Sequence, residues 1–240
     1  MCTVTLIPIN KNDFILTSNR DEQHKRPNAL LPNIIEIDGK SVLAPIDSQA
    51  SGTWILTTEN NITACLLNGA FEKHISDPPY ARSRGLVVRS VAEFEHIDDF
   101  AQIVDLEGVE PFTLVLAQKL KNGTKAKELR WDGSDKHITD LDPNNIHIWS
   151  SATLYSSEIR LERENVYKEA FETLTERTPE KILEFHTYGM ETETKTPIFL
   201  KTSTHQTVST TQIIAQGDSA KMYYQDWLTG NGKSIELKTA

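Results

Sequence analysis

The sequence predicts an α+β fold in which β-sheets lie between layers of helices. The first observation is the order of the predicted elements, which runs strands, helices, strands, helices, strands instead of alternating one strand with one helix. The second is the length, because 240 residues can bury a sizeable core and fall in the range of single-domain sandwiches and barrels. We therefore expect one domain over residues 1–240, and a doubly wound parallel sheet suits this order less well.

Two short segments at the start of the chain predict a hairpin. Residues 3–9 and 13–17 alternate as strands do, and the Asn-Lys-Asn stretch between them favours a turn. The two strands of a hairpin run antiparallel, so Cys2 at the start of the first strand should lie near residues 19–21. We expect residues 19–21 just past the end of the second strand.

The period of the apolar residues predicts the remaining elements. Leu86 and Val87 begin a helical repeat that predicts a helix over residues 83–96. Pro179 suits the first position of a helix and predicts a short helix over residues 178–186. The other predicted strands cover residues 41–45, 53–57, 62–67, 112–117, 128–131, 146–149, 206–216, 220–227 and 235–238, and the other predicted helices cover residues 97–106 and 157–175.

Charge and composition exclude several classes of function. The chain has 34 acidic residues against 25 lysines and arginines, a net charge of -9, which disfavours binding to nucleic acids and to anionic lipid. No apolar run approaches the roughly 18 residues of a membrane span, and the first twenty residues lack the pattern of a signal peptide. We expect a cytoplasmic protein with no nucleic-acid partner. The oligomeric state stays open.

The number and spacing of the cysteines argue against disulfide-rich and metal-binding classes of protein. The only two cysteines, Cys2 and Cys65, cannot build a disulfide framework, and no Cys-x-x-Cys or His-Glu-x-x-His spacing predicts a metal site. Cys65 lies between Ala64 and Leu66, which predicts a core position. We therefore expect neither a metal nor another cofactor.

Cys2 is the first candidate for chemistry. If Met1 is removed, Cys2 carries a thiol and an amine on one residue, and an amine with a pKa of about 7.7–8.0 can act as base toward its own thiol. Arg20 would favour the thiolate by its charge, and Asp21 could hold the ammonium. The alternative is that Cys2 is a small apolar strand residue beside a solvated turn.

Other residues have both a functional and a structural interpretation. Asn68, followed by Gly69, could donate to an oxyanion or could simply form a turn. Trp54 could line a ligand pocket or pack in the core. Arg82 and Arg84 could bind a carboxylate or phosphate at a helix start, or could be solvated.

Several motifs resemble those of a known family. The string MCTV followed by SNRDEQHKRP resembles the NRDE family, which is named for four of these residues and includes the transport and Golgi organization 2 proteins. The resemblance continues through the segments VLAPIDSQASGTWILTTENNITACLLN, ARSRG, PFTLVL, WSSATLYSSEIR and HQTVSTTQII. Through that family the chain is similar to the N-terminal nucleophile hydrolases, in particular the cysteine branch with penicillin V acylase and choloylglycine hydrolase. The resemblance implies their four-layer αββα sandwich.

The resemblance also implies roles for the residues around the predicted hairpin. It makes Cys2 the nucleophile and Asp21 the partner of its α-amine, and Asn19 corresponds as well. The acylase branch has its arginine two residues earlier, where this chain has Ser18, so Arg20 is the NRDE family's own arginine.

Two further positions differ from the acylase branch. Ser151 stands where that branch has an oxyanion asparagine, and Val208 stands where it has a second arginine. The function that the resemblance implies is hydrolysis or transfer of an acyl group from an amide or thioester small molecule. The alternative is a non-catalytic carrier of haem or of an acyl or lipid metabolite on the same scaffold.

Overall fold

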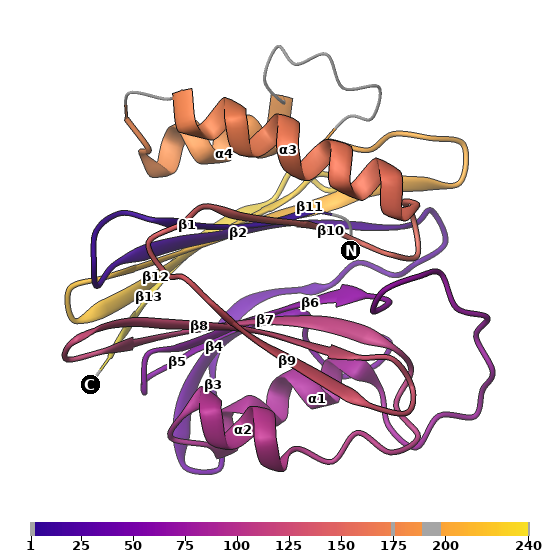
Figure 1. The fold of residues 1–240 in the computed structure, drawn as a ribbon, viewed down its shortest axis with the longest axis horizontal. Coiled ribbons are helices and arrows are strands. Elements are labelled where there is room, and N and C mark those ends of the chain that lie inside the picture. The colour runs from indigo at the N-terminus through magenta and orange to yellow at the C-terminus, as the bar shows by residue number, and fades with distance from the viewer. Residues whose placement is uncertain (1–2, 174–175, 189–197, 240) are drawn as a thin grey trace.

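Two antiparallel sheets face each other in the computed structural model, which describes residues 3–173, 176–188 and 198–239 (Figure 1). The six-stranded sheet contains, in spatial order, β10 (His147–Ser150), β1 (Thr3–Pro8), β2 (Phe14–Gln23), β11 (His205–Gln216), β12 (Ser219–Asp226) and β13 (Gly232–Lys238). The seven-stranded sheet contains β3 (Leu30–Ile37), β4 (Lys40–Ile46), β5 (Ile55–Thr58), β6 (Ile62–Asn68), β7 (Phe112–Leu120), β8 (Gly123–Trp131) and β9 (Lys136–Leu141).

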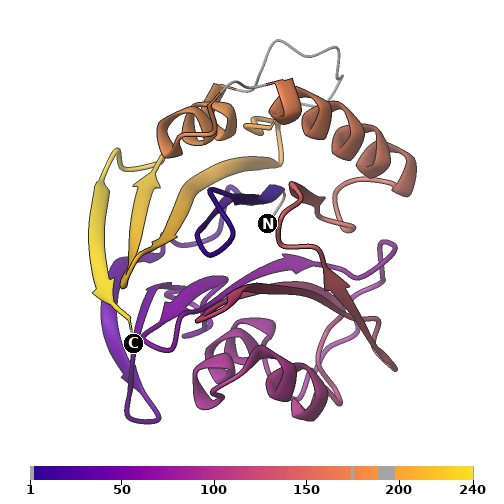
Figure 2. The ribbon, with the colours of Figure 1, turned by 60° about the vertical axis from the view of Figure 1, so that its left-hand side comes forward.

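Helices cover the outer face of each sheet. The helices α3 (Ser157–Thr173) and α4 (Pro179–Tyr188) lie over the six-stranded sheet (Figure 1). The helices α1 (Arg84–Ser90) and α2 (Ile97–Ile103), with a 3₁₀ turn at Val91–Glu93 between them, lie under the seven-stranded sheet, and Figure 2 shows the same four layers from another side. This arrangement is αββα and confirms the predicted fold class.

Alternating side chains of the central strands fill two apolar layers. On β2, Leu16 points between the sheets, in a cluster that continues to Leu116 of β7 and Phe100 of α2. The next residue back, Ile15, points to the helices and joins the cluster of Phe171 and Phe185, whose rings lie 4.2 Å apart. Because successive residues of a strand face opposite sides, β2 supplies side chains to both layers.

The strand β2 is longer than predicted. The sequence places residues 19–21 after a strand that ends at residue 17, but β2 continues to Gln23, and that prediction is wrong. Asn19 is paired on both sides, with Thr3 of β1 and with Thr210 of β11. The polar side chains of this stretch have low strand propensity, but the neighbouring strands satisfy their hydrogen bonds, so the ladder continues.

The start of the chain lies where the hairpin prediction places it. Thr3 is opposite Asn19, and the β1–β2 register continues to Pro8 opposite Phe14. Cys2 itself lies outside the described residues. The prediction is therefore confirmed as far as Thr3, the next residue along the chain.

The other differences concern edges and helix ends. The edge strands β3 and β9 are not predicted, because their residues are mostly exposed or half-buried and show no clean alternation. β8 begins at Gly123, five residues before the predicted start. The helix predicted over residues 83–96 ends at Ser90. At Phe94 the backbone already has an extended conformation. The predicted start of α4 at Pro179 is confirmed.

Two glycines from the motifs quoted above pack against each other. A Cβ built on Gly52 would lie 2.6 Å from the carbonyl carbon of Gly85, and the Thr53 N–H donates to the Gly85 carbonyl at 3.2 Å. The obstacle is backbone, which cannot move aside as a flexible side chain can. The segment before Trp54 therefore lies directly against the first turn of α1, and this contact requires glycine.

We expect Gly52→Ala to lower the free energy of unfolding by about 1–3 kcal/mol, because the added methyl group must push apart two backbone segments. Urea denaturation measures the change. The matched control is Gly232→Ala, whose Cβ would first meet the side-chain oxygen of Gln225 at 3.0 Å, an atom that can move away. Equal effects of the two substitutions would show that the glycine contact carries no stability.

Candidate functional site

Two adjoining cavities open where β2 and β6 end. The larger has a volume of about 690 Å³ and the smaller about 420 Å³. Their walls share Glu22, Arg26, Asn68, Arg84 and Glu110, so we treat them as one cleft.

The cleft collects most of the residues predicted for the site. Asp21 and Asn68 line the larger cavity, and Arg20, Trp54 and Asn68 line the smaller one. Arg84 lines both cavities and Arg82 lines the smaller. Asn19 and Ser151 are fully buried and line neither cavity, and Cys2 is not among the described residues.

Neighbouring residues of β2 serve opposite faces of the six-stranded sheet. The Asn19 side-chain amide donates to the carbonyl of His186 in α4 at 2.7 Å, on the helix side. The Arg20 guanidinium lies on the other side, 4.4 Å from the centre of the Trp54 ring. Asp21 turns back to the helix side, where its carboxylate accepts a hydrogen bond from the Thr207 hydroxyl. Consecutive residues of the Asn-Arg-Asp sequence therefore make contacts on both faces of the six-stranded sheet, because side chains of a strand alternate between its faces.

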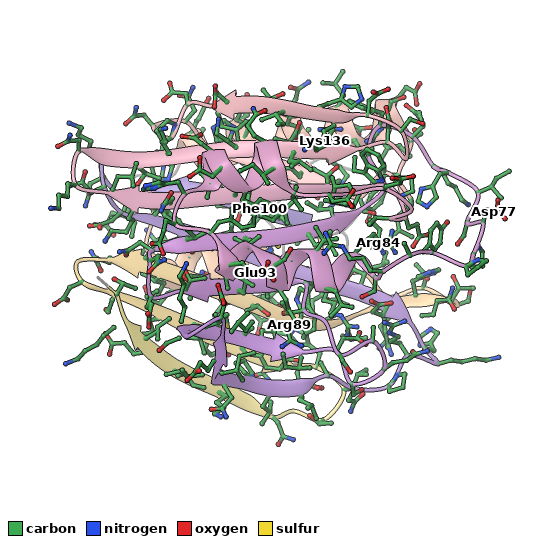
Figure 3. The ribbon with its side chains drawn as sticks, turned by 90° about the horizontal axis from the view of Figure 1, so that it is seen from below. Asp77, Arg84, Arg89, Glu93, Phe100 and Lys136 are labelled. Atoms are coloured by element: carbon green, nitrogen blue, oxygen red, sulfur yellow. The ribbon has the colours of Figure 1, made fainter. Side chains whose placement is uncertain are left out.

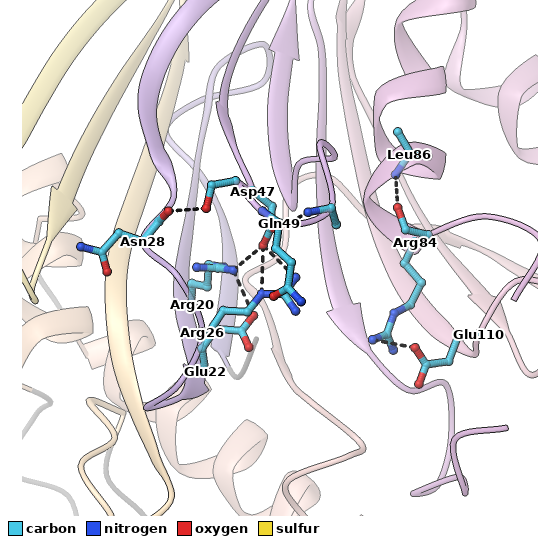
Figure 4. A network of polar contacts seen from close by, with 12 residues as sticks. Arg20, Glu22, Arg26, Asn28, Asp47, Gln49, Arg84, Leu86 and Glu110 are labelled. Atoms are coloured by element: carbon cyan, nitrogen blue, oxygen red, sulfur yellow. Dashed lines mark hydrogen bonds and ion pairs between the residues drawn. The ribbon is translucent and has the colours of Figure 1, made fainter. Parts of the chain in front are cut away.

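Asp47 holds the two arginines that shape the smaller cavity. Its Oδ2 accepts from Arg20 Nη2 at 2.7 Å and from Arg26 Nη2 at 2.9 Å (Figure 4). Glu22 also pairs with Arg20 Nη2, at 3.2 Å. Burial alone would raise the pKa of the Asp47 carboxyl, but the Ala50 N–H and the two arginine charges outweigh burial and lower it.

A second ion-pair group lies across the cleft. Glu110 accepts from Arg84 Nη2 at 2.9 Å and contacts His74 Nε2 at 3.0 Å. Burial lowers the pKa of Arg84, and the Glu110 charge opposes that shift. Arg84 begins α1, beside the loop that carries Asp77 beyond the edge of the sheets (Figure 3). Arg82 differs, because its guanidinium donates to the carbonyl of Asp105 at 2.7 Å.

Ser151 and Asn68 are brought into contact. The Ser151 hydroxyl donates to the Asn68 backbone carbonyl at 2.8 Å and lies 3.0 Å from the Thr153 hydroxyl. An oxyanion role for Ser151 would require this bond to break. Asn68 lines both cavities, and its side-chain amide has no hydrogen-bond partner within residues 3–173, 176–188 and 198–239. Gly69 has a φ of +81°, a left-handed backbone conformation that glycine adopts at little cost.

Cys65 is not a candidate nucleophile. Cys65 is fully buried between the sheets, as predicted, and burial raises the pKa of its thiol to about 12. It stays protonated at neutral pH. Val208, where the acylase branch has a second arginine, is also buried.

Several residues of the cleft were not predicted from the sequence. Asp47 had a usable signal, since an aspartate after a strand often accepts from the backbone two or three residues on, as it does here from Gln49 and Ala50. Glu22, Lys25 and Arg26 lie in the SNRDEQHKRP motif, but the motif alone assigned them no role. Segments distant in sequence bring in the others, which are Lys73, His74, Glu110 and His205.

The described residues contain neither a membrane-spanning helix nor a cluster of metal ligands. Over the described ranges, no helix is long and apolar enough to cross a bilayer. The same residues form no group of three or more His, Cys, Asp or Glu side chains that could hold a metal ion.

Solved structures of N-terminal nucleophile hydrolases resemble the fold. A variant of conjugated bile acid hydrolase from Clostridium perfringens matches with a TM-score of 0.63 at 8% identity, over 98% of this chain and 92% of that one. Penicillin V acylase from Agrobacterium tumefaciens matches with a TM-score of 0.60 at 10% identity, over 98% and 86%. An N-acylethanolamine-hydrolyzing acid amidase orthologue from Caenorhabditis elegans matches with a TM-score of 0.60 at 13% identity, over 88% and 92%. These likenesses show the fold and confirm the expected resemblance.

Sequence comparison identifies the family. No curated protein matches the chain. A family model described as Transport and Golgi organisation 2 matches residues 1–226, which is nearly the whole length. The chain therefore belongs to the Transport and Golgi organisation 2 family.

Proposed function

We propose that the protein is an N-terminal cysteine hydrolase or acyltransferase that acts on an amide or thioester of a small molecule. The nucleophile is the sulfur of Cys2 after removal of Met1. The observation that carries the proposal is the pairing of Thr3, the residue after Cys2, with Asn19 in a strand whose next residues line the cleft. The fold shared with hydrolases of amide bonds supports it.

The proposed reaction has two steps. In the first, the α-amine of Cys2 takes the thiol proton, the sulfur bonds to the acyl carbon, and the bond to the leaving amine or thiol breaks. The leaving group departs with the proton held by the ammonium. In the second, water or another acceptor attacks the thioester, releases the acyl group and restores the thiol.

Three residues have roles that their environments suit. Asp21 is buried, and its carboxylate can hold the α-ammonium in place. The side-chain amide of Asn68 faces the cleft and can donate to the oxyanion that develops during attack. Arg20 is a positioning residue, because Asp47, Glu22 and the Trp54 ring already engage its guanidinium.

A thiol-reactive acyl probe tests the proposal. We expect it to label the wild-type protein and to leave Cys2→Ala unlabelled. The matched control is Cys65→Ala, which should label as the wild type does, because the Cys65 thiol is buried and protonated. Equal labelling of the wild type and Cys2→Ala would show that Cys2 is not the nucleophile.

A further inference from the structure

The cleft differs in charge from the rest of the protein. Six lysine and arginine side chains and four carboxylates line its two cavities, a formal charge of +2, whereas the whole chain carries -9. The cationic residues are Arg20, Lys25, Arg26, Lys73, Arg82 and Arg84, and the acidic ones are Asp21, Glu22, Asp47 and Glu110. A cleft of one sign in a protein of the other attracts ligands of opposite charge.

The acids of the cleft are already engaged by protein groups. Glu22 and Asp47 pair with arginines, Glu110 pairs with Arg84, and Asp21 accepts from the Thr207 hydroxyl. The ion pairs therefore neutralise three of the four acids, Glu22, Asp47 and Glu110, together with three of the four arginines. The charge that remains available to a ligand must come from other side chains.

In the larger cavity two lysines supply that charge, and Arg82, which donates only to a backbone carbonyl, lies in the smaller one. Lys25, on the loop after β2, and Lys73, on the loop after β6, both line the larger cavity. Neither forms an ion pair with a carboxylate of the described part of the chain, and both are exposed. They come from segments on opposite sheets, so the cavity lies between them.

A buried donor points to the same chemistry from the smaller cavity. Trp54 lines that cavity and is only 4% exposed, and its indole Nε1 is buried with no hydrogen-bond partner in residues 3–173, 176–188 and 198–239. A buried N–H without an acceptor is costly, and nearly all such groups in folded proteins are satisfied. Because Trp54 lines the smaller cavity, a ligand oxygen that reached this N–H would satisfy it.

We propose that the cleft binds a small molecule that carries a carboxylate or phosphate group. The anionic group lies in the larger cavity with Lys25 and Lys73, and a further oxygen of the same molecule accepts from the Trp54 indole N–H in the smaller one. Each cavity exceeds the roughly 300 Å³ at which ligand pockets begin. The inference rests on the proposed function in one respect, that it gives the amide or thioester substrate an anionic group.

Titration with inorganic phosphate, and separately with acetate, tests the inference. The readout is the NMR backbone amide resonances of Lys25 and Lys73, which line the larger cavity, and the Trp54 indole N–H, assigned by its absence in Trp54→Phe, reports the smaller cavity. We expect saturable binding of at least one of the two anions, weakened at least about tenfold in Lys25→Gln/Lys73→Gln, because each lysine donates a charge-assisted hydrogen bond. The anion that binds more tightly identifies the group.

The matched control is Lys11→Gln/Lys221→Gln, which removes two exposed lysines that line neither cavity. It should bind as the wild type does. Equal affinity of the two double variants, or no saturable shift of the Lys25 and Lys73 resonances with either anion, would overturn the inference.

Cys2→Ser separates this inference from the proposed function. We expect it to bind the anion as the wild type does, because Lys25, Lys73 and Trp54 do not depend on the thiol. Anion binding without any acyl adduct on the wild type would overturn the proposed function alone. An acyl adduct without anion binding would overturn only the inference that the substrate carries an anionic group.

Discussion

Replacing Asp21 with asparagine slows acylation of Cys2 by about 100-fold, the loss expected when a reacting group is held less well in position. The carboxylate of Asp21 is buried, and asparagine keeps its shape while removing its charge. The ammonium of Cys2 then loses the group proposed to orient it. The measurement is the rate of labelling by the acyl probe, with the thermal midpoint recorded alongside.

A pH profile separates this role from a structural one. A nearby carboxylate favours the ammonium and raises the pKa of the α-amine, so its loss should move the lower limb of the labelling profile to lower pH. The matched control is Asp38→Asn, an exposed turn residue with a φ of +51° that asparagine tolerates. An unchanged rate and an unchanged profile in a folded Asp21→Asn variant would remove Asp21 from the proposed mechanism.

Asp47→Asn should lower the free energy of unfolding by about 2 kcal/mol at neutral pH, because it removes the charge that pairs Arg20 and Arg26. The Arg20 side chain is only 4% exposed, so water compensates poorly. Urea denaturation gives the difference.

A second aspartate in a turn separates the effect of the arginine ion pairs from the effect of the turn itself. Asp142 also accepts from a backbone N–H two residues on, that of Asn144, but it is exposed and no arginine pairs with it in the described residues. Asparagine can accept in both turns, so Asp142→Asn should leave stability nearly unchanged. Similar losses in both variants would mean that the turn, and not the ion pairs, stabilises this part of the cleft.

The effect of Asp47 should depend on pH. Its folded-state pKa is lowered, so its contribution is present above the ordinary carboxyl value of 3.8 and is lost as pH falls through the lower folded-state pKa. The difference between wild type and Asp47→Asn should therefore be constant from about pH 7 to about pH 5 and shrink below about pH 4. A difference that grows on acidification would contradict this linkage.

Local patterns predicted the elements that have local causes. The turn at residues 10–12 and the start of α4 at Pro179 follow from turn and proline chemistry. The extension of β2 through Asn19 has a non-local cause, since β1 and β11 satisfy its polar groups. A sequence pattern gives no signal for such a contact.

The residues of the cleft likewise divide into those with a local signal in the sequence and those without one. Motifs within one segment indicated Arg20, Asp21 and Asn68. Glu110 joins Arg84 and His74 only because the loops after β6 and before β7 meet at the start of α1. Lys73 was equally hidden, and Lys25 lies in the SNRDEQHKRP motif without a predicted role, although both supply unpaired charge to the larger cavity.

The central claim is that Cys2 becomes the amino terminus and accepts an acyl group. The most direct test is the mass of the N-terminal peptide after incubation with a panel of amides and thioesters, some with a carboxylate or phosphate. The account predicts a peptide without Met1 that carries the acyl increment on Cys2. Quantitative retention of Met1, or an increment that persists in Cys2→Ala, would contradict it.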